Sequence, residues 1–270
     1  VADAMGALLR LLAAEPIRNG FMASLAAGLA TGAGAAPILF VRKISQKAQD
    51  TMMGFGAGVM LAASAFSLIL PGLATAARQT ASATLGALLV AAGVAAGGLV
   101  LWAADRLTPH QHFVRGAEGP AALRIKQTWL FVFAIALHNF PEGLAVGVAA
   151  NDATPALGAS VAMAIGLQNM PEGLIVALAL AALGYARWKA LAVALLTGLV
   201  EPVAGLFGAS VVAMATAMLP WALAFAGGAM LFVVSHEIIP ESHRQGHETW
   251  ATMGVLGGFV TFMILNTALA

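Results

Sequence analysis

The sequence predicts an all-α membrane protein, a single bundle of eight transmembrane helices. Hydrophobic residues make up 60% of the 270 residues and charged residues 9%, against about 45–50% and about 25% in soluble domains. The mean hydropathy is +0.89. The apolar residues form continuous runs rich in Ala, Leu and Gly, whereas a β-barrel would need alternating segments of about 10 residues. Helices are therefore favoured.

Eight apolar runs are long enough to cross a bilayer, which takes about 20 residues. The expected helices cover residues 21–41, 52–74, 84–104, 128–150, 156–183, 190–213, 219–239 and 250–269. We therefore interpret residues 1–270 as one transmembrane domain with short loops, the longest being 105–127. This leaves no room for a soluble catalytic domain, so we do not expect an enzyme.

The basic residues predict the orientation of this bundle. Ten of the 13 Lys and Arg residues fall in the loops after helices one, three, five and seven. By the positive-inside rule these loops are cytoplasmic, which leaves both ends of the bundle outside. The net charge of +1 comes without a basic patch, so nucleic acid is excluded as a partner. The expected partners are divalent metal ions and the lipid bilayer, with a homodimer as a further expectation.

Two related motifs occupy the middle of neighbouring helices. The fourth helix contains HNFPEG at 138–143, and the fifth contains QNMPEG at 168–173. Because consecutive helices run in opposite directions, the two motifs form an inverted repeat, an arrangement that many transporters use to build a central site. Helical spacing puts the polar residues of each motif on one face. The candidate ligands are His138, Asn139, Glu142, Gln168, Asn169 and Glu172, with Glu201 near the middle of the sixth helix.

The three glutamates need compensation for their charge. A carboxylate near the bilayer centre costs about 2.5–3.5 kcal/mol, and no Lys or Arg lies inside helices four to seven. Protons or an external cation must therefore balance Glu142, Glu172 and Glu201. One divalent ion with a protonated glutamate and a two-metal site both satisfy this balance. Imidazole, carboxylate and amide donors without cysteine favour Zn²⁺.

A second polar stretch, SHEIIPESH, closes the seventh helix at 235–243. Its His236 and Glu237 are candidate metal ligands that would hand the ion to the cytosol. The same stretch also brings further candidates near the cytoplasmic face, namely Glu241, His243 and His247, together with Asp105, His110 and His112 of the long loop. A solvated helix end explains the pattern equally well.

These residues resemble the ZIP family (Zrt-, Irt-like proteins) of divalent-metal transporters. The resemblance rests on the eight-helix layout, the paired motifs, the Glu-Pro pair at 201–202 and the H-E-x-x-P-E string at 236–241. It implies import of Zn²⁺ across a bacterial inner membrane by alternating access. Under the resemblance His138, Glu142, Gln168 and Glu172 are primary ligands, Asn139 and Asn169 ligate a second metal, Glu201 bridges, and Met60 is an added ligand. Many members have His where this chain has Gln168, so Cd²⁺, Fe²⁺, Co²⁺ and Mn²⁺ are alternative substrates.

Two rival interpretations start from the same residues. An intramembrane zinc protease would need H-E-x-x-H on a helix, but Pro240 occupies the second ligand position. A cation-selective channel could use the same ligands as a carrier. The sequence thus argues against the protease and leaves channel and carrier open.

Overall fold

The computed structural model describes residues 15–41, 44–107, 121–151 and 155–269. Over these residues all regular structure is helical, without a strand. In chain order the elements are α2 (Glu15–Ala35), η1 (Ala36–Leu39), α3 (Gln46–Ala63), η2 (Ser64–Ile69), α4 (Leu70–Thr80), α5 (Ala83–Leu107), α6 (Ala121–Ala149), α7 (Pro155–Ala182), α8 (Arg187–Gly198), α9 (Val200–Met214), η3 (Thr216–Met218), α10 (Leu219–Val233), η4 (Val234–Ile238), α11 (Ile239–His243) and α12 (Glu248–Leu269).

These elements join into eight spans, which we number in chain order. Seven helical stretches within the described residues are long and apolar enough to cross a membrane, and α6, with 29 residues, is the remaining span. Span 1 is α2 with η1, span 2 runs from α3 to α4, and spans 3, 4, 5 and 8 are α5, α6, α7 and α12. Span 6 joins α8 to α9, and span 7 runs from η3 to α11. The chain is thus a multi-pass, all-α membrane protein.

Several helices begin before the apolar runs that predict them. Span 2 starts at Gln46 rather than near residue 52, because the Ser45 hydroxyl caps the helix by accepting a hydrogen bond of 3.2 Å from the backbone N–H of Ala48. A cap satisfies one of the free N–H groups at a helix start, so the helix can extend beyond its apolar part. As a result Asp50 lies inside a helix, where it is buried.

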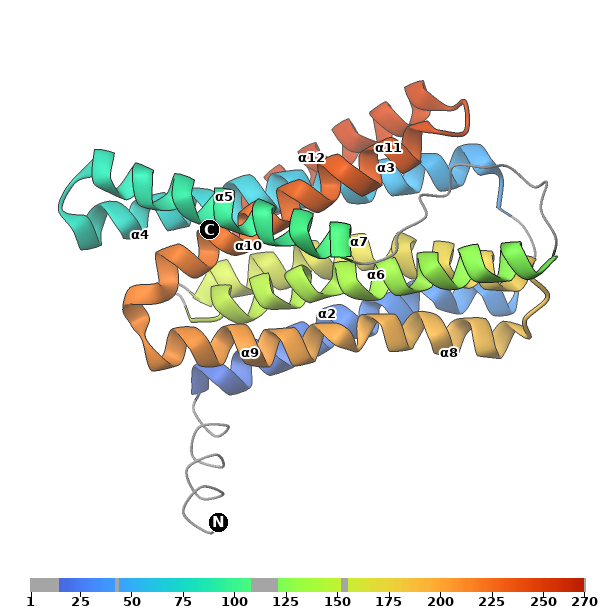
Figure 1. The fold of residues 1–270 in the computed structure, drawn as a ribbon, viewed down its shortest axis with the longest axis horizontal. Coiled ribbons are helices and arrows are strands. Elements are labelled where there is room, and N and C mark those ends of the chain that lie inside the picture. Colours follow the sequence, from blue (N-terminus) through green and yellow to red (C-terminus); the bar gives the residue numbers. More distant parts are fainter. Residues whose placement is uncertain (1–14, 42–43, 108–120, 152–154, 270) are drawn as a thin grey trace, which may run out of the picture.

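The spans pack as two groups of four. In the first group α2 packs along α7, while α6 packs along α9. In the second group α3 packs along α12, while α5 packs along α10 (Figure 1). Between the groups α3 contacts α7 and α10 contacts α6. Exchanging spans 1, 2, 3 and 4 with spans 6, 7, 8 and 5 reproduces these pairings, as expected for an inverted repeat.

Irregular turns interrupt three spans near polar residues. Spans 2 and 7 each contain a π-helical turn, η2 and η4, which is followed by Pro71 or Pro240. A proline has no N–H and clashes with the preceding turn, so a wider turn accommodates it. Span 6 breaks at Leu199, between α8 and α9. The break puts Glu201 in the first turn of α9.

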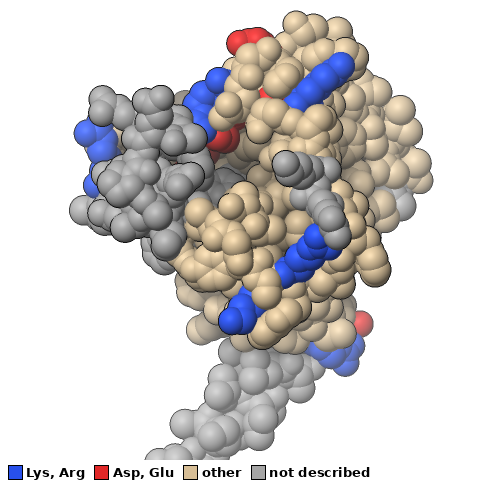
Figure 2. Space-filling view, turned by 90° about the vertical axis from the view of Figure 1, so that its right-hand side faces the viewer, with Lys and Arg blue, Asp and Glu red and all other residues tan. Residues whose placement is uncertain are grey.

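The helices that follow spans 1, 3, 5 and 7 begin at the same end of the molecule. In Figure 1 the starts of α3, α6, α8 and α12 lie at its right-hand side, and the start of α2 and the C-terminus lie toward the opposite end. Figure 2 views the right-hand side directly and shows Lys and Arg side chains distributed around it. The chain therefore concentrates its basic residues at one end, which is the asymmetry that the positive-inside rule uses.

Candidate metal centre

Glycines bring the helices of the two motifs against neighbouring backbones. A Cβ on Gly143 would overlap the carbonyl oxygen of Glu201, and a Cβ on Gly173 would overlap the carbonyl oxygen of Thr31. Small residues of this kind allow membrane helices to approach closely. Each motif therefore packs its Pro-Glu-Gly turn directly on a helix of the same four-span group, α6 on α9 and α7 on α2.

A chain of hydrogen bonds links the polar side chains at this contact. The amide of Gln168 donates to Oδ1 of Asn169 over 2.6 Å, and the amide of Asn169 donates to Oε1 of Glu201 over 2.6 Å. Asn169 also donates to the carbonyl oxygen of Ala27 over 2.8 Å. All three side chains are buried. The side chain of Asn169 therefore joins spans 1, 5 and 6.

The motif glutamates adjoin this chain. Glu142, fully buried, shares a hydrogen bond with Gln168 and interacts electrostatically with Glu172 and Glu201. Glu172 is half-buried. The structure thus brings five predicted site residues into one polar cluster, Glu142, Gln168, Asn169, Glu172 and Glu201. The side chain of His138 lies outside the described part of the chain.

Some buried polar atoms beside the cluster have no hydrogen-bond partner among the described residues. They include both polar atoms of the Asn139 amide, Oε2 of Glu201 and the hydroxyl of Thr31. A buried polar atom without a partner costs about 1–3 kcal/mol, and native proteins leave few of them. These oxygens are therefore available to a ligand. Their chemistry, amide and carboxylate oxygen, suits a divalent cation.

No three His, Asp or Glu side chains meet at metal-binding distance within the described residues. Instead, the amide side chains of Gln168 and Asn169 lie between the carboxylates of Glu142 and Glu201. To bind one cation with all three carboxylates, Glu142, Glu172 and Glu201 would have to move closer together. The arrangement thus places candidate metal ligands close together without forming a complete coordination shell.

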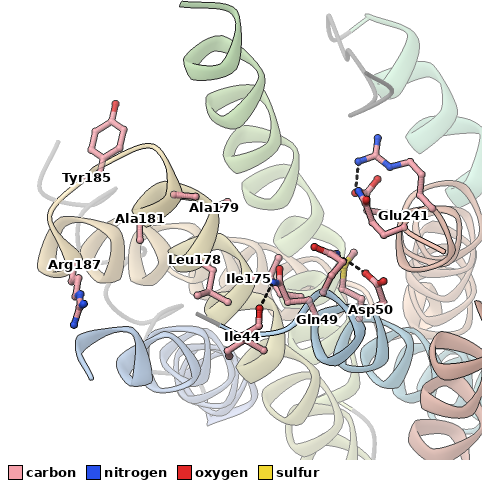
Figure 3. A pocket seen from close by; sticks show the side chains of 15 residues that line it. Ile44, Gln49, Asp50, Ile175, Leu178, Ala179, Ala181, Tyr185, Arg187 and Glu241 are labelled. Atoms are coloured by element: carbon pink, nitrogen blue, oxygen red, sulfur yellow. Dashed lines mark hydrogen bonds and ion pairs between the residues drawn. The ribbon is translucent and has the colours of Figure 1, made fainter. Parts of the chain in front are cut away.

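Two cavities lead away from the cluster. The smaller, about 40 Å³, is lined by Gln168 and Glu172 and is large enough for a water molecule or an ion. The larger, about 580 Å³, is lined by Arg187 at the start of α8 and by Arg244, among the residues drawn in Figure 3; we call it the vestibule. Both cavities are lined by Met53 and Ile175. The side chains of Met53 and Ile175 therefore separate the vestibule from the small cavity beside the cluster.

The remaining predicted ligands, Met60, His236 and Glu237, are not members of the hydrogen-bonded chain from Gln168 to Glu201. Met60 is buried in the main apolar core. His236 is exposed and stacks on Phe232, with 4.9 Å between the ring centroids. Glu237 is half-buried in η4. Nothing in these contacts joins His236 or Glu237 to the central cluster.

His243, at the end of span 7, and His247, which follows it, contact separate partners. His243 contacts the hydroxyl of Thr252 over 3.0 Å, whereas His247 contacts the carboxylate of Asp50 over 2.8 Å. Glu241 forms an ion pair of 3.0 Å with Arg244. The loop residues His110 and His112, and the side chain of Asp105, lie outside the described part. The second cluster expected from the sequence is thus divided among several contacts.

Asp50 and Thr31 are two polar residues of interest that sequence reasoning did not single out. Asp50 precedes the apolar run of span 2 and resembles an ordinary solvated helix start, yet only 1% of it is exposed. Thr31 is a common residue in membrane helices. Its neighbours Gly28 and Gly32 have a small-residue spacing typical of close helix packing, and this spacing is the sequence signal at this part of span 1.

Comparisons with known proteins agree with this description. A family model described as ZIP Zinc transporter matches residues 111–266. The chain is 50% identical over 250 residues to the zinc transporter GufA of Myxococcus xanthus, covering 93% of this chain and 98% of that protein. It is 48% identical over 245 residues to the zinc transporter ZIPB of Bordetella bronchiseptica, covering 90% and 79%. The human zinc transporter ZIP11 is 34% identical over an aligned length of 323, covering 88% and 94%. The chain belongs to the ZIP zinc transporter family.

Proposed function

We propose that this protein imports Zn²⁺ into the cytoplasm through a mid-membrane site on α6, α7 and α9. The observation that carries the proposal is the buried chain from Gln168 through Asn169 to Glu201, with Glu142 and Glu172 beside it. The sequence from residue 127 to 186, which contains both motifs, has no Lys or Arg. A cation is therefore the natural counter-charge for these carboxylates.

The ligand set follows from the donors in and around the cluster. Glu142, Gln168 and Glu172, with His138, would hold one ion, and Asn139, Asn169 and Glu201 would extend the site to a second. Support for a second ion comes from the amide of Asn139 and Oε2 of Glu201, which have no hydrogen-bond partner among the described residues. With two divalent ions the three carboxylates leave one positive charge, and with one ion they leave one negative charge, which a proton neutralises.

Alternating access would come from motion between the two four-span groups. The cluster's residues all belong to spans 4, 5 and 6 of one group, while Met53 of the other group separates the cluster from the vestibule. Sliding one group against the other would exchange the side from which the cluster is reached. The described conformation, with its vestibule at the basic end, corresponds to a state that faces the cytoplasm under the positive-inside rule.

The decisive test is Zn²⁺ uptake into proteoliposomes loaded with a fluorescent zinc indicator. Glu142→Ala and Glu172→Ala should each reduce uptake at least about tenfold, the lower end of the cost for disturbing a metal site. Glu248→Ala is the matched control, because Glu248 is exposed in the first turn of α12, outside the cluster. Near-normal uptake by both cluster variants would refute the site. Uptake that saturates with Zn²⁺ concentration indicates a carrier, and a linear dependence indicates a channel.

A further inference from the structure

The vestibule contains one deeply buried carboxylate, Asp50. Figure 3 shows Asp50 of α3 and Glu241 of α11 at the same cavity, whose other walls come from α7 and the start of α8. Only 1% of Asp50 is exposed, although it lines an open cavity of about 580 Å³. A buried carboxylate needs partners or a cation to offset its lost hydration. The contacts of Asp50 therefore indicate what the vestibule can bind.

Both oxygens of Asp50 face donors. Oδ1 accepts a hydrogen bond of 2.8 Å from the amide of Gln46, and Oδ2 lies 2.8 Å from Nδ1 of His247. Two ligands of one Zn²⁺ at about 2.0–2.1 Å stand about 3 Å apart. A small widening would therefore let a divalent ion replace the proton between Asp50 and His247. The side chain of Gln46 adjoins the same carboxylate through its amide nitrogen, and its amide oxygen is a third candidate metal ligand if the amide turns over.

The other charged side chains that the structure describes around the vestibule contact other partners. Arg244 pairs with Glu241 over 3.0 Å, and Arg187 donates to the carbonyl oxygen of Leu39 over 2.9 Å. The ammonium of Lys47 lies 3.4 Å from the ring centroid of Trp250. These contacts hold the cationic side chains on other partners. A divalent ion in the vestibule would therefore meet Asp50 without displacing a Lys or Arg from it.

A short path connects Asp50 with the central cluster. Met53 follows Asp50 by three residues on α3, so the two side chains share a face of the helix. Met53 and Ile175 line both the vestibule and the small cavity that holds Gln168 and Glu172. An ion leaving the cluster would pass this pair, where the Met53 thioether is a soft donor, and Asp50 is the carboxylate one helical turn further on.

We propose that Asp50 and His247 form a second, weak divalent-cation site in the vestibule, where the transported ion binds after passing Met53 and Ile175. This inference rests on the proposed function. Two strong protein donors, completed by water, would bind an ion loosely enough to release it, as conduction through successive sites requires. The alternative role for Asp50 and His247 is structural: their contact would link the N-terminal end of α3 to the N-terminal end of α12.

The test uses Co²⁺ as a spectroscopic probe in the full-length protein with Glu142→Ala and Glu172→Ala together, which disables the central site. We expect residual Co²⁺ binding with an absorption spectrum that reports imidazole and carboxylate ligands. Adding Asp50→Asn or His247→Gln should weaken it at least about tenfold. Glu241→Gln, which changes the other vestibule carboxylate, is the matched control and should leave it unchanged. Absence of residual binding, or binding indifferent to Asp50→Asn and His247→Gln, overturns the proposal.

A second measurement separates ion transfer from a structural link. Asp50→Asn keeps the shape of the side chain and one accepting oxygen, so it preserves the link between α3 and α12. In the chain with an intact central site it should lower the maximal rate of Zn²⁺ uptake several-fold and leave the half-saturating Zn²⁺ concentration unchanged. An unchanged rate overturns the transfer role. Failure of the central site is recognised separately, because the double glutamate variant would then retain wild-type Zn²⁺ binding and uptake.

Discussion

The amide of Asn169 donates a hydrogen bond of 2.6 Å to Oε1 of Glu201, and this bond joins span 5 to span 6 inside the polar cluster. The same amide nitrogen reaches the carbonyl oxygen of Ala27 on span 1. Asn169 therefore fixes one oxygen of Glu201 in place, while Oε2 has no protein partner among the described residues. Its role is to orient a carboxylate as well as to offer an oxygen of its own.

Replacing Asn169 by Ala should weaken Zn²⁺ binding by about 10–100-fold, the usual cost of removing a group that orients a metal ligand. Without the hydrogen bond from Asn169, the carboxylate of Glu201 would no longer be held in place, so part of the binding free energy of the ion would be spent on ordering it. Equilibrium Zn²⁺ titration of the purified protein measures the effect. Ser210→Ala is a suitable control, because the Ser210 hydroxyl bonds only its own helix at Leu206. Equal affinities for the Asn169 variant and wild type would contradict the anchoring role.

Substituting Ala for Gly143 should destabilise the fold by about 1–3 kcal/mol, the range for overpacking a core. The added methyl group would overlap the backbone of Glu201, which cannot shift without moving α9. Gly257→Ala is the matched control, because an added Cβ at Gly257 meets nothing within 4 Å. Thermal unfolding in one detergent compares the two. If both variants melt together with wild type, the close contact between α6 and α9 is not required for stability.

Much of this architecture is predictable because apolar length alone determines where a chain crosses a bilayer. The repeated Pro-Glu-Gly motifs likewise predict Glu142 and Glu172 on neighbouring helices of opposite direction. The contacts between distant spans are not predictable in this way. The hydrogen bond from Asn169 to Ala27 joins residues 142 positions apart. Hydropathy identifies the transmembrane helices but does not tell which of them pack against each other. Asp50 was missed for the same reason, since its contact with His247, the residue before span 8, joins residues 197 positions apart.

Gln168→His should raise Zn²⁺ affinity and increase discrimination against Mn²⁺. Imidazole suits Zn²⁺ better than an amide does, whereas Mn²⁺ prefers oxygen ligands. Gln168 is buried, begins the chain of hydrogen bonds to Asn169 and Glu201, and lines the small cavity. A histidine at this position would therefore face the same cavity and the same neighbouring ligands. Competition between the two ions in proteoliposome uptake measures the change. Unaltered competition would mean that residue 168 does not contact the ion.

The proposed orientation predicts opposite labelling of the two ends. The chain has no cysteine, so single substitutions report one site each. Ala186→Cys, between α7 and α8, and Ala83→Cys, at the start of α5, are exposed at opposite ends of the molecule (Figure 1). An impermeant thiol reagent applied to intact cells should label Ala83→Cys and leave Ala186→Cys unlabelled until the membrane is opened. The reverse pattern would contradict the proposed orientation.

Zn²⁺ binding should weaken as the pH falls from about 7 to about 5. Histidine and carboxylate ligands must lose their protons to bind a metal, so protons and Zn²⁺ compete for the site. An imidazole in water loses its proton near pH 6.5, which lies inside this window. Added protons oppose binding at His138 and at Glu142, Glu172 and Glu201, so every contribution has the same sign, and affinity rises with pH.

The variant His138→Gln separates these contributions. It should bind Zn²⁺ more weakly at pH 7 and show a shallower dependence on pH, because only the carboxylates still exchange protons for metal. Equilibrium titrations of both proteins at several pH values, in one detergent and at one ionic strength, give the two slopes. The Glu248→Ala protein, changed outside the cluster, should follow the wild-type slope. If wild-type affinity stays constant across the window, Zn²⁺ binds without displacing protons, and the ligands are not the histidine and glutamates of the two motifs.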